Sequence, residues 1–125
     1  MREVIGIVSL NGRELPLARA NRVGNLVFVS GQLPFGPDGT IVGSTIMEQT
    51  QQALTNLAAV LAEAGATLSQ VAKVTVWLTD ASDFQGFNEV YARFFPTRPP
   101  ARSTVISALA VDALIEIEAI ACVGA

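Results

Sequence analysis

The 125-residue sequence contains no histidine, and this absence excludes several kinds of catalytic site. Serine and cysteine nucleophiles usually depend on a histidine base, and histidine is the side chain that most readily exchanges protons near neutral pH. With one cysteine and no histidine, a zinc site has almost no ligands to use. No GxGxxG or GxxxxGKS/T motif predicts a nucleotide-binding loop. We therefore expect no metal and no cofactor, and catalysis has to use arginine, lysine, carboxylates, hydroxyls, backbone groups and water.

Charged residues are also scarce, at 15% of the chain, whereas half of the residues are hydrophobic. A typical soluble domain carries about 25% charged residues. This deficit leaves less polar surface than a free monomer usually presents, so we expect identical subunits to cover much of it. An unusually apolar monomer is the alternative, because single apolar residues occur on any protein surface.

Neither a membrane segment nor a disulfide framework is expected. No apolar run reaches the roughly 20 residues that span a bilayer. The N-terminus, Met1-Arg2-Glu3, leads into a short alternating segment rather than into a signal-peptide core. The single cysteine, Cys122, has no partner within the chain. We therefore expect a cytoplasmic protein, and the length predicts one domain, residues 1–125.

Local sequence patterns predict an α+β domain. Apolar or alternating runs bounded by turn residues predict strands at 4–10, 26–30, 40–42, 71–79, 102–107 and 114–123. Apolar residues at helical spacing predict helices at 45–64, with Thr45 and Glu48 as a capping box, and at 82–95. The order βββαβαββ favours a mixed sheet with both helices on one face. The other face is then bare in a monomer, which again favours a trimer-like association.

The predicted strand at 71–79 illustrates this bare face. Its alternation assigns Ala72, Val74, Val76 and Leu78 to the core. The opposite face combines Trp77 with lysine and threonine, so we expect it to meet a partner rather than bulk water.

The most informative stretch is the last strand, 114–122. Its alternation puts Glu116, Glu118, Ile120 and Cys122 on one face. Carboxylates among apolar residues are costly to bury without partners. Glu118 lies deeper in the apolar run than Glu116, so it is our candidate for a desolvated carboxylate with a raised pKa, able to accept or donate a proton. A salt bridge at a subunit contact, or a solvated sheet edge, explains the same spacing without catalysis.

Two further segments are candidates for substrate binding. Arg102 follows Pro99-Pro100, which restrict the backbone, and a guanidinium held this way suits a small carboxylate. The alternative is an ordinary surface charge after a turn. Ser30 and Gly31 end an apolar strand, and a glycine there lets backbone N–H groups approach a ligand closely. An ordinary strand-terminating turn is again the alternative.

Four segments of the chain together resemble a known pattern of family signatures. In order, they are Val29–Pro34, the region of Asn88, Tyr91 and Phe94-Phe95, Pro100–Ser103, and Ile115–Ala121. Together they resemble the signature segments of the RidA (YjgF-like) reactive intermediate deaminase family. The resemblance implies a chorismate-mutase-like α+β fold and a homotrimer with three clefts between subunits. It also implies cofactor-independent hydrolysis of enamines and imines, such as 2-aminoacrylate, to a 2-keto acid and ammonia.

The same resemblance implies a set of site residues. Arg102 is similar to the family arginine that binds the substrate carboxylate, and Glu118 to the acid that positions water. The implied substrate-binding residues are Leu17, Ser30, Gly31, Asn88, Tyr91 and Thr104. Two of these depart from the family pattern, which typically has tyrosine at the Leu17 position and often cysteine at the Thr104 position. The missing phenol makes the mouth of the cleft more apolar.

Two other functions compete with the deaminase. The same cleft could bind a small carboxylate without turnover, a reading that Leu17 favours. RNA cleavage is disfavoured by the net charge of −3, the pI of about 4.8 and the absence of histidine. We therefore expect a small imino or enamino acid as the ligand, and neither a nucleic acid nor a membrane as a partner.

Overall fold

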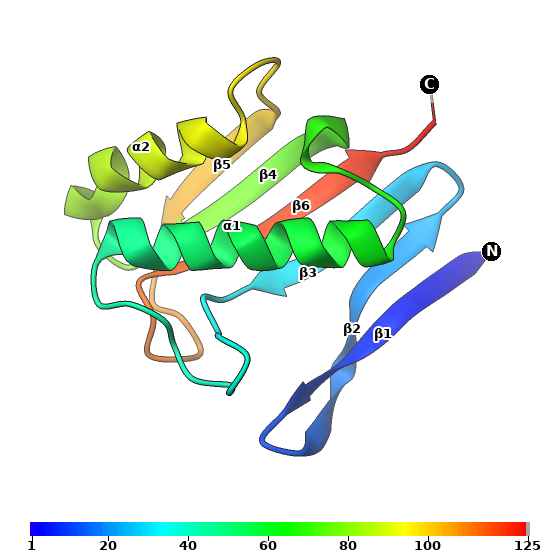
Figure 1. Ribbon diagram of the computed structural model, residues 1–125, viewed down its shortest axis with the longest axis horizontal. Coiled ribbons are helices and arrows are strands. Elements are labelled where there is room, and N and C mark those ends of the chain that lie inside the picture. The colour runs from blue at the N-terminus through cyan, green and yellow to red at the C-terminus, as the bar shows by residue number, and fades with distance from the viewer. Residues whose placement is uncertain (125) are drawn as a thin grey trace.

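The computed structural model describes residues 1–124, which form one mixed sheet with two helices packed on one of its faces (Figure 1). The strands are β1 (Arg2–Leu10), β2 (Arg13–Val23), β3 (Leu26–Gln32), β4 (Val71–Leu78), β5 (Ala101–Ile106) and β6 (Ile115–Cys122). The helices are α1 (Ile46–Glu63) and α2 (Phe84–Phe94). The sheet order is β1-β2-β3-β6-β4-β5, and only β4 and β5 pair in parallel. The predicted α+β architecture is confirmed.

Helix α1 begins at the predicted capping box. The backbone N–H of Glu48 donates to Thr45 Oγ1 at 3.2 Å, and the N–H of Thr45 donates to the Glu48 carboxylate at 3.2 Å. The buried face of the helix, which includes Leu54, Leu57 and Leu61, packs into the core above β3 and β6. Neither helix in residues 1–124 is long and apolar enough to cross a membrane.

Three sequence-based expectations are wrong. Residues 13–23, where no strand was predicted, form β2, whose charged sequence becomes extended by pairing with β1 and β3. The predicted strand at 40–42 contributes only a single bridge between Ile41 and Phe35. Ala72 is exposed rather than in the core, because the register between β4 and β6 shifts after Val71, which takes the buried position instead.

The face of the sheet that carries no helices is bare, and it exposes apolar side chains beside Lys73, Thr75 and the two glutamates of β6. Leu26 and Phe28 on β3 are 39% and 40% exposed, and Val105 on β5 is 40% exposed. Ile120 and Trp77 lie between them on β6 and β4 and are partly exposed. The predicted bare face is therefore present, and its cover by other subunits stays a prediction.

Candidate functional site

Gly31 and Glu116 form the centre of the candidate site. The register between β3 and β6 shifts between Val29 and Gln32, so the backbone of β3 bulges beside Glu116. The Glu116 side chain lies directly against Gly31: a Cβ added at residue 31 would lie 2.9 Å from Cδ of Glu116 and 3.2 Å from its Cγ. Such a Cβ would overlap Oε2 of Glu116, so any other residue at position 31 forces the end of this carboxylate to move.

The Glu116 carboxylate is partly desolvated. Burial raises the pKa of Glu116, and the negative charge of Glu118 on the same face raises it further. The one ion pair in residues 1–124 joins Arg19 to Glu63, so Glu116 has no cationic partner there. The shared face of the two glutamates was predicted correctly. Glu116 is the carboxylate beside the bulge at Gly31, and the role predicted for Glu118 stays a prediction.

Gly31 and Glu116 line a cavity of about 680 Å³. It opens where β2 and β3 separate, since their pairing stops at Ala20 and Val29. Its walls come from the β1–β2 hairpin, residues 31–39, one side of α1 and residues 110–111. Most lining side chains are apolar, among them Val8, Leu10, Leu15, Leu17, Leu33, Phe35, Ala59 and Val111.

A second cavity, of about 240 Å³, adjoins the first at the same two residues. Its lining adds Glu118, Trp77 and residues 107–110. Gly31 and Glu116 therefore contribute to both cavities, whereas Glu118 contributes only to the smaller one.

Polar side chains of α1 hold the loop that walls the larger cavity. Asn56 Nδ2 donates to the carbonyl oxygens of Leu33 and Phe35, both at 2.9 Å. Gln52 Nε2 donates to the same carbonyl of Phe35 at 3.2 Å and to Asn56 Oδ1 at 2.9 Å. These bonds satisfy loop carbonyls that form no ladder with a strand, so the wall is fixed before any ligand binds.

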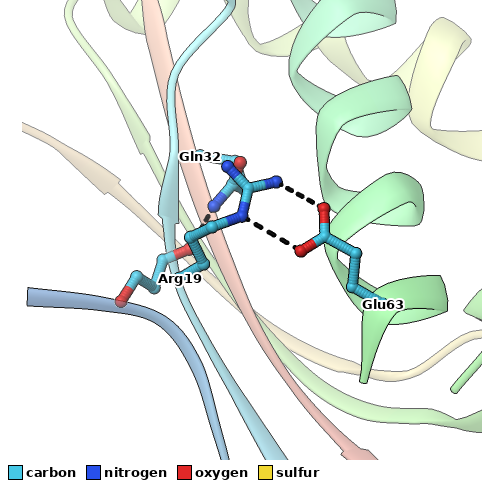
Figure 2. Close-up of polar contacts among 4 residues, drawn as sticks. Arg19, Gln32 and Glu63 are labelled. Atoms are coloured by element: carbon cyan, nitrogen blue, oxygen red, sulfur yellow. Dashed lines mark hydrogen bonds and ion pairs between the residues drawn. The ribbon is translucent and has the colours of Figure 1, made fainter. Parts of the chain in front are cut away.

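An ion pair holds the opposite wall. Arg19 on β2 binds Glu63 on α1 through two parallel contacts, Nη2 to Oε1 at 2.8 Å and Nε to Oε2 at 3.2 Å (Figure 2).

The Ser30 hydroxyl donates to the carbonyl of Ala18 at 2.6 Å, and Gln32 Nε2 donates to the carbonyl of Ser30 at 3.0 Å. The hydroxyl of Ser30 is thus committed to the protein backbone.

Arg102 lies in a different part of the molecule, between β5 and α2. Its guanidinium carbon is 4.7 Å from the ring centre of Tyr91, 5.0 Å from that of Phe87 and 5.7 Å from that of Phe84. Burial raises the pKa of the Tyr91 phenol, and the charge of Arg102 offsets part of this effect. Arg102 has no acidic partner in residues 1–124. Three aromatic rings thus orient a guanidinium whose charge is free to bind an anion.

The two groups of candidate residues lie on opposite faces of the sheet. Arg102 pairs with Val74, whose side chain is buried under the helices, whereas Glu118 pairs with Thr75 on the bare face. Their strands, β5 and β6, are two strand spacings apart, which is about 10 Å. One chain therefore does not bring Arg102 and a glutamate of β6 to the same small molecule.

The remaining predicted residues divide in the same way. Leu17 and Gly31 line the larger cavity with Glu116, and Ser30 precedes Gly31 on β3. Asn88 and Tyr91 on α2 and Thr104 on β5 lie on the Arg102 side. No group of three or more cysteine, aspartate or glutamate side chains in residues 1–124 is arranged to hold a metal ion.

Comparisons with known proteins cover both groups. Residues 13–123 match the family model described as Endoribonuclease L-PSP. The chain is 50% identical over 108 residues to a RutC family protein of Pyrococcus abyssi, covering 85% of each chain. It is 44% identical over 108 residues to Reactive Intermediate Deaminase A, chloroplastic, of Arabidopsis thaliana, covering 85% of this chain and 58% of that protein. The crystal structure of E. coli TdcF with bound serine matches with a TM-score of 0.85 and 36% identity, covering 95% of this chain and 98% of that chain.

Proposed function

Because this chain belongs to the RidA (YjgF-like) family, which includes the proteins of the Endoribonuclease L-PSP model, we propose that it is a cofactor-independent deaminase of reactive imines. The family and its fold are as predicted from the sequence. One relative bears the name Reactive Intermediate Deaminase. The observation that carries the proposal is the partly desolvated Glu116 carboxylate, which lies at the junction of two cavities and has no cationic partner within residues 1–124.

We further propose that the protein works as a homotrimer with each site between two copies. The bare face, with Phe28 and Val105 exposed, supports an assembly of this kind. So does the division of the site, since Arg102 and Glu116 lie on opposite faces of one sheet. In the trimer, Arg102 of one copy would face Glu116 of its neighbour.

In the proposed reaction, water adds to the carbon of the imine. Arg102 binds the substrate carboxylate through two parallel hydrogen bonds, which orients the imine carbon toward Glu116. As the C–O bond forms, the π electrons of the C=N bond move to nitrogen, which takes a proton from solvent, while Glu116 accepts a proton from the water, and a carbinolamine results. Glu116 then returns its proton to nitrogen. The C–N bond breaks as the hydroxyl oxygen forms the C=O bond and releases its proton to solvent, so ammonia leaves and the 2-keto acid forms. The imine carbon is already electrophilic, so the reaction needs no histidine-activated nucleophile.

This proposal revises the roles predicted for the two glutamates. Glu116, rather than Glu118, is the proposed proton acceptor, because it contacts Gly31 and lines both cavities. Glu118 lines the smaller cavity, and its charge helps to raise the pKa of Glu116. It is the proposed residue that helps to position the water.

The other candidate residues receive supporting roles. Asn88 and Thr104 remain proposed substrate contacts beside Arg102. Tyr91 is proposed to orient the guanidinium, because its ring is the closest of the three to that group. Ser30 is proposed to act through its backbone, since its hydroxyl already bonds to Ala18.

A second candidate function is the binding of a small carboxylate without turnover. It is supported by the bound serine in the TdcF structure, because an amino acid carries the same carboxylate as an imino acid. RNA cleavage receives no support from this chain. Its net charge is −3, and RNA binding normally depends on a positive surface.

The experiment that tests the proposal measures ammonia and 2-keto acid released from imines that an amino acid oxidase generates in situ. The wild type is compared with Arg102→Ala, Glu116→Gln and Glu118→Gln, and sedimentation verifies the trimer of each protein. We expect Arg102→Ala and Glu116→Gln to lose turnover and Glu118→Gln to keep more of it. Intact turnover in Arg102→Ala would contradict the site. No acceleration by a verified wild-type trimer would favour the binding function.

A further inference from the structure

We infer that the cavity of about 680 Å³ is a side-chain subsite, and that the preferred substrates are imines of 2-keto acids with large apolar side chains. The inference rests on the proposed function and adds the substrate class to it. The position of the cavity is the first reason for it, because Glu116 and Gly31 line the cavity. When the imine carbon of a substrate lies beside Glu116, the side chain attached to that carbon therefore lies next to this cavity and can enter it.

The chemistry of the walls favours an apolar substituent. Leu17 is 40% exposed in this chain and lines the cavity together with Leu15 and Phe35. Burial of apolar surface against such side chains is favourable because it removes both surfaces from water.

Most polar side chains in the walls already have partners within residues 1–124, and Ser9 and Glu116 are the exceptions. Arg19 is paired with Glu63, and Asn56 bonds to the carbonyl oxygens of the cavity loop. Gln52 donates to the same loop and to Asn56, and Gln32 donates to the backbone of Ser30. A negatively charged substituent would therefore lose its hydration beside the Glu116 carboxylate, and a neutral polar one would gain few free partners in return.

The size of the cavity points to large substituents. It falls in the range of roughly 300–1,000 Å³ typical of sites for whole small molecules. A methyl group would leave most of this volume to water, each molecule of which takes about 30 Å³. A branched or aromatic substituent would displace that water from apolar walls. One methylene in an apolar pocket changes kcat/KM by about 10- to 200-fold, so size alone gives a measurable preference.

The first test compares imines generated from alanine, leucine and phenylalanine. We expect kcat/KM for the leucine- and phenylalanine-derived imines to exceed that for the alanine-derived imine by at least about tenfold. Equal values, or a preference for the alanine-derived imine, would overturn the inference while leaving the deaminase intact.

The second test fills the cavity from α1. Ala59 and Ala62 are both exposed alanines on α1, but only Ala59 lines the cavity. In Ala59→Phe, the ratio of kcat/KM for the leucine- and alanine-derived imines should fall about tenfold. In the matched control Ala62→Phe the ratio should stay unchanged. Thermal unfolding and sedimentation establish that both variants fold and assemble. An unchanged ratio in folded Ala59→Phe overturns the inference.

A binding measurement separates this inference from the proposed function. Calorimetry compares the product analogues pyruvate and 4-methyl-2-oxopentanoate on the wild type and on Ala59→Phe. Tighter binding of the larger keto acid, by about tenfold and lost in Ala59→Phe, supports the subsite even where no imine is hydrolysed. Turnover of imines without preference, together with equal binding of both keto acids, rejects the subsite and keeps the deaminase.

Discussion

The contact between Gly31 and Glu116 makes the substitution Gly31→Ala a direct test of the site. The new Cβ would overlap Oε2 of Glu116 and would lie 2.9 Å from its Cδ, whereas ordinary contacts begin near 3.4 Å. The overlap with Oε2 is the larger one, so the end of the carboxylate must move by about 1 Å. The backbone of Gly31 lies outside the left-handed region, so alanine fits the local conformation without strain. The displaced carboxylate is thus the expected effect of this substitution.

This displacement should reduce activity more than stability. A misplacement of about 1 Å can cost on the order of 100-fold in rate, so this displacement predicts a loss of about that size in kcat/KM. Overpacking costs about 1–3 kcal/mol of unfolding free energy, which lowers Tm by several degrees in a domain of this length.

A double-mutant cycle assigns the effect to the contact itself. Equilibrium unfolding is measured for Gly31→Ala in the wild type and in Glu116→Ala, at one protomer concentration because assembly shifts apparent stability. We expect the destabilisation to disappear in the Glu116→Ala background. The same destabilisation in both backgrounds, or wild-type kinetics in Gly31→Ala, would refute the reasoning.

Three further predictions follow from other contacts. Arg102→Lys keeps the charge but loses the planar group that stacks on three aromatic rings. Steady-state kinetics should therefore show kcat/KM reduced by at least about tenfold. A value near that of the wild type would contradict the orienting role of the rings. Because burial raises the pKa of Glu116, its protonated form stabilises the fold below the ordinary carboxyl pKa, and this stabilisation is lost as the pH rises through the raised value. Glu116→Gln should therefore raise Tm more at pH 8 than at pH 4, and equal shifts at the two pH values would count against a desolvated carboxylate. Asn56→Ala removes two bonds to loop carbonyls and should cost about 1–3 kcal/mol in urea unfolding, whereas its exposed neighbour Thr55→Ala should cost far less.

The elements that the sequence predicted well are those whose signal is local. The capping box of Thr45 and Glu48 depends on residues three positions apart, and it is present at the predicted position. The alternation that put Glu116 and Glu118 on one face depends only on the period of a strand. Both helices were found for the same reason.

The features that were missed depend on pairing between distant segments. The sequence of β2 mixes four charged residues with Pro16 and small alanines, and its extended state comes from its two neighbouring strands. The bulge of β3 beside β6 is likewise set between strands, and it decides that Glu116 is the carboxylate beside Gly31. The depth of an apolar run within β6 cannot reveal what the adjacent strand covers, so the contact between Glu116 and Gly31 could not be predicted.

The placement of Arg102 and Glu116 on opposite faces of one sheet has a genetic consequence. In the proposed ring of three copies, each site takes its arginine from one copy and its glutamate from the next. A subunit that lacks Arg102 and a subunit that lacks Glu116 are each inactive alone, but adjacent in one ring they form a complete site. With random mixing in equal amounts, about one site in four is complete. Two inactivating substitutions in the same gene, one at Arg102 and one at Glu116, would then complement each other. Each substitution removes one residue from a site whose other residue comes from the neighbouring subunit.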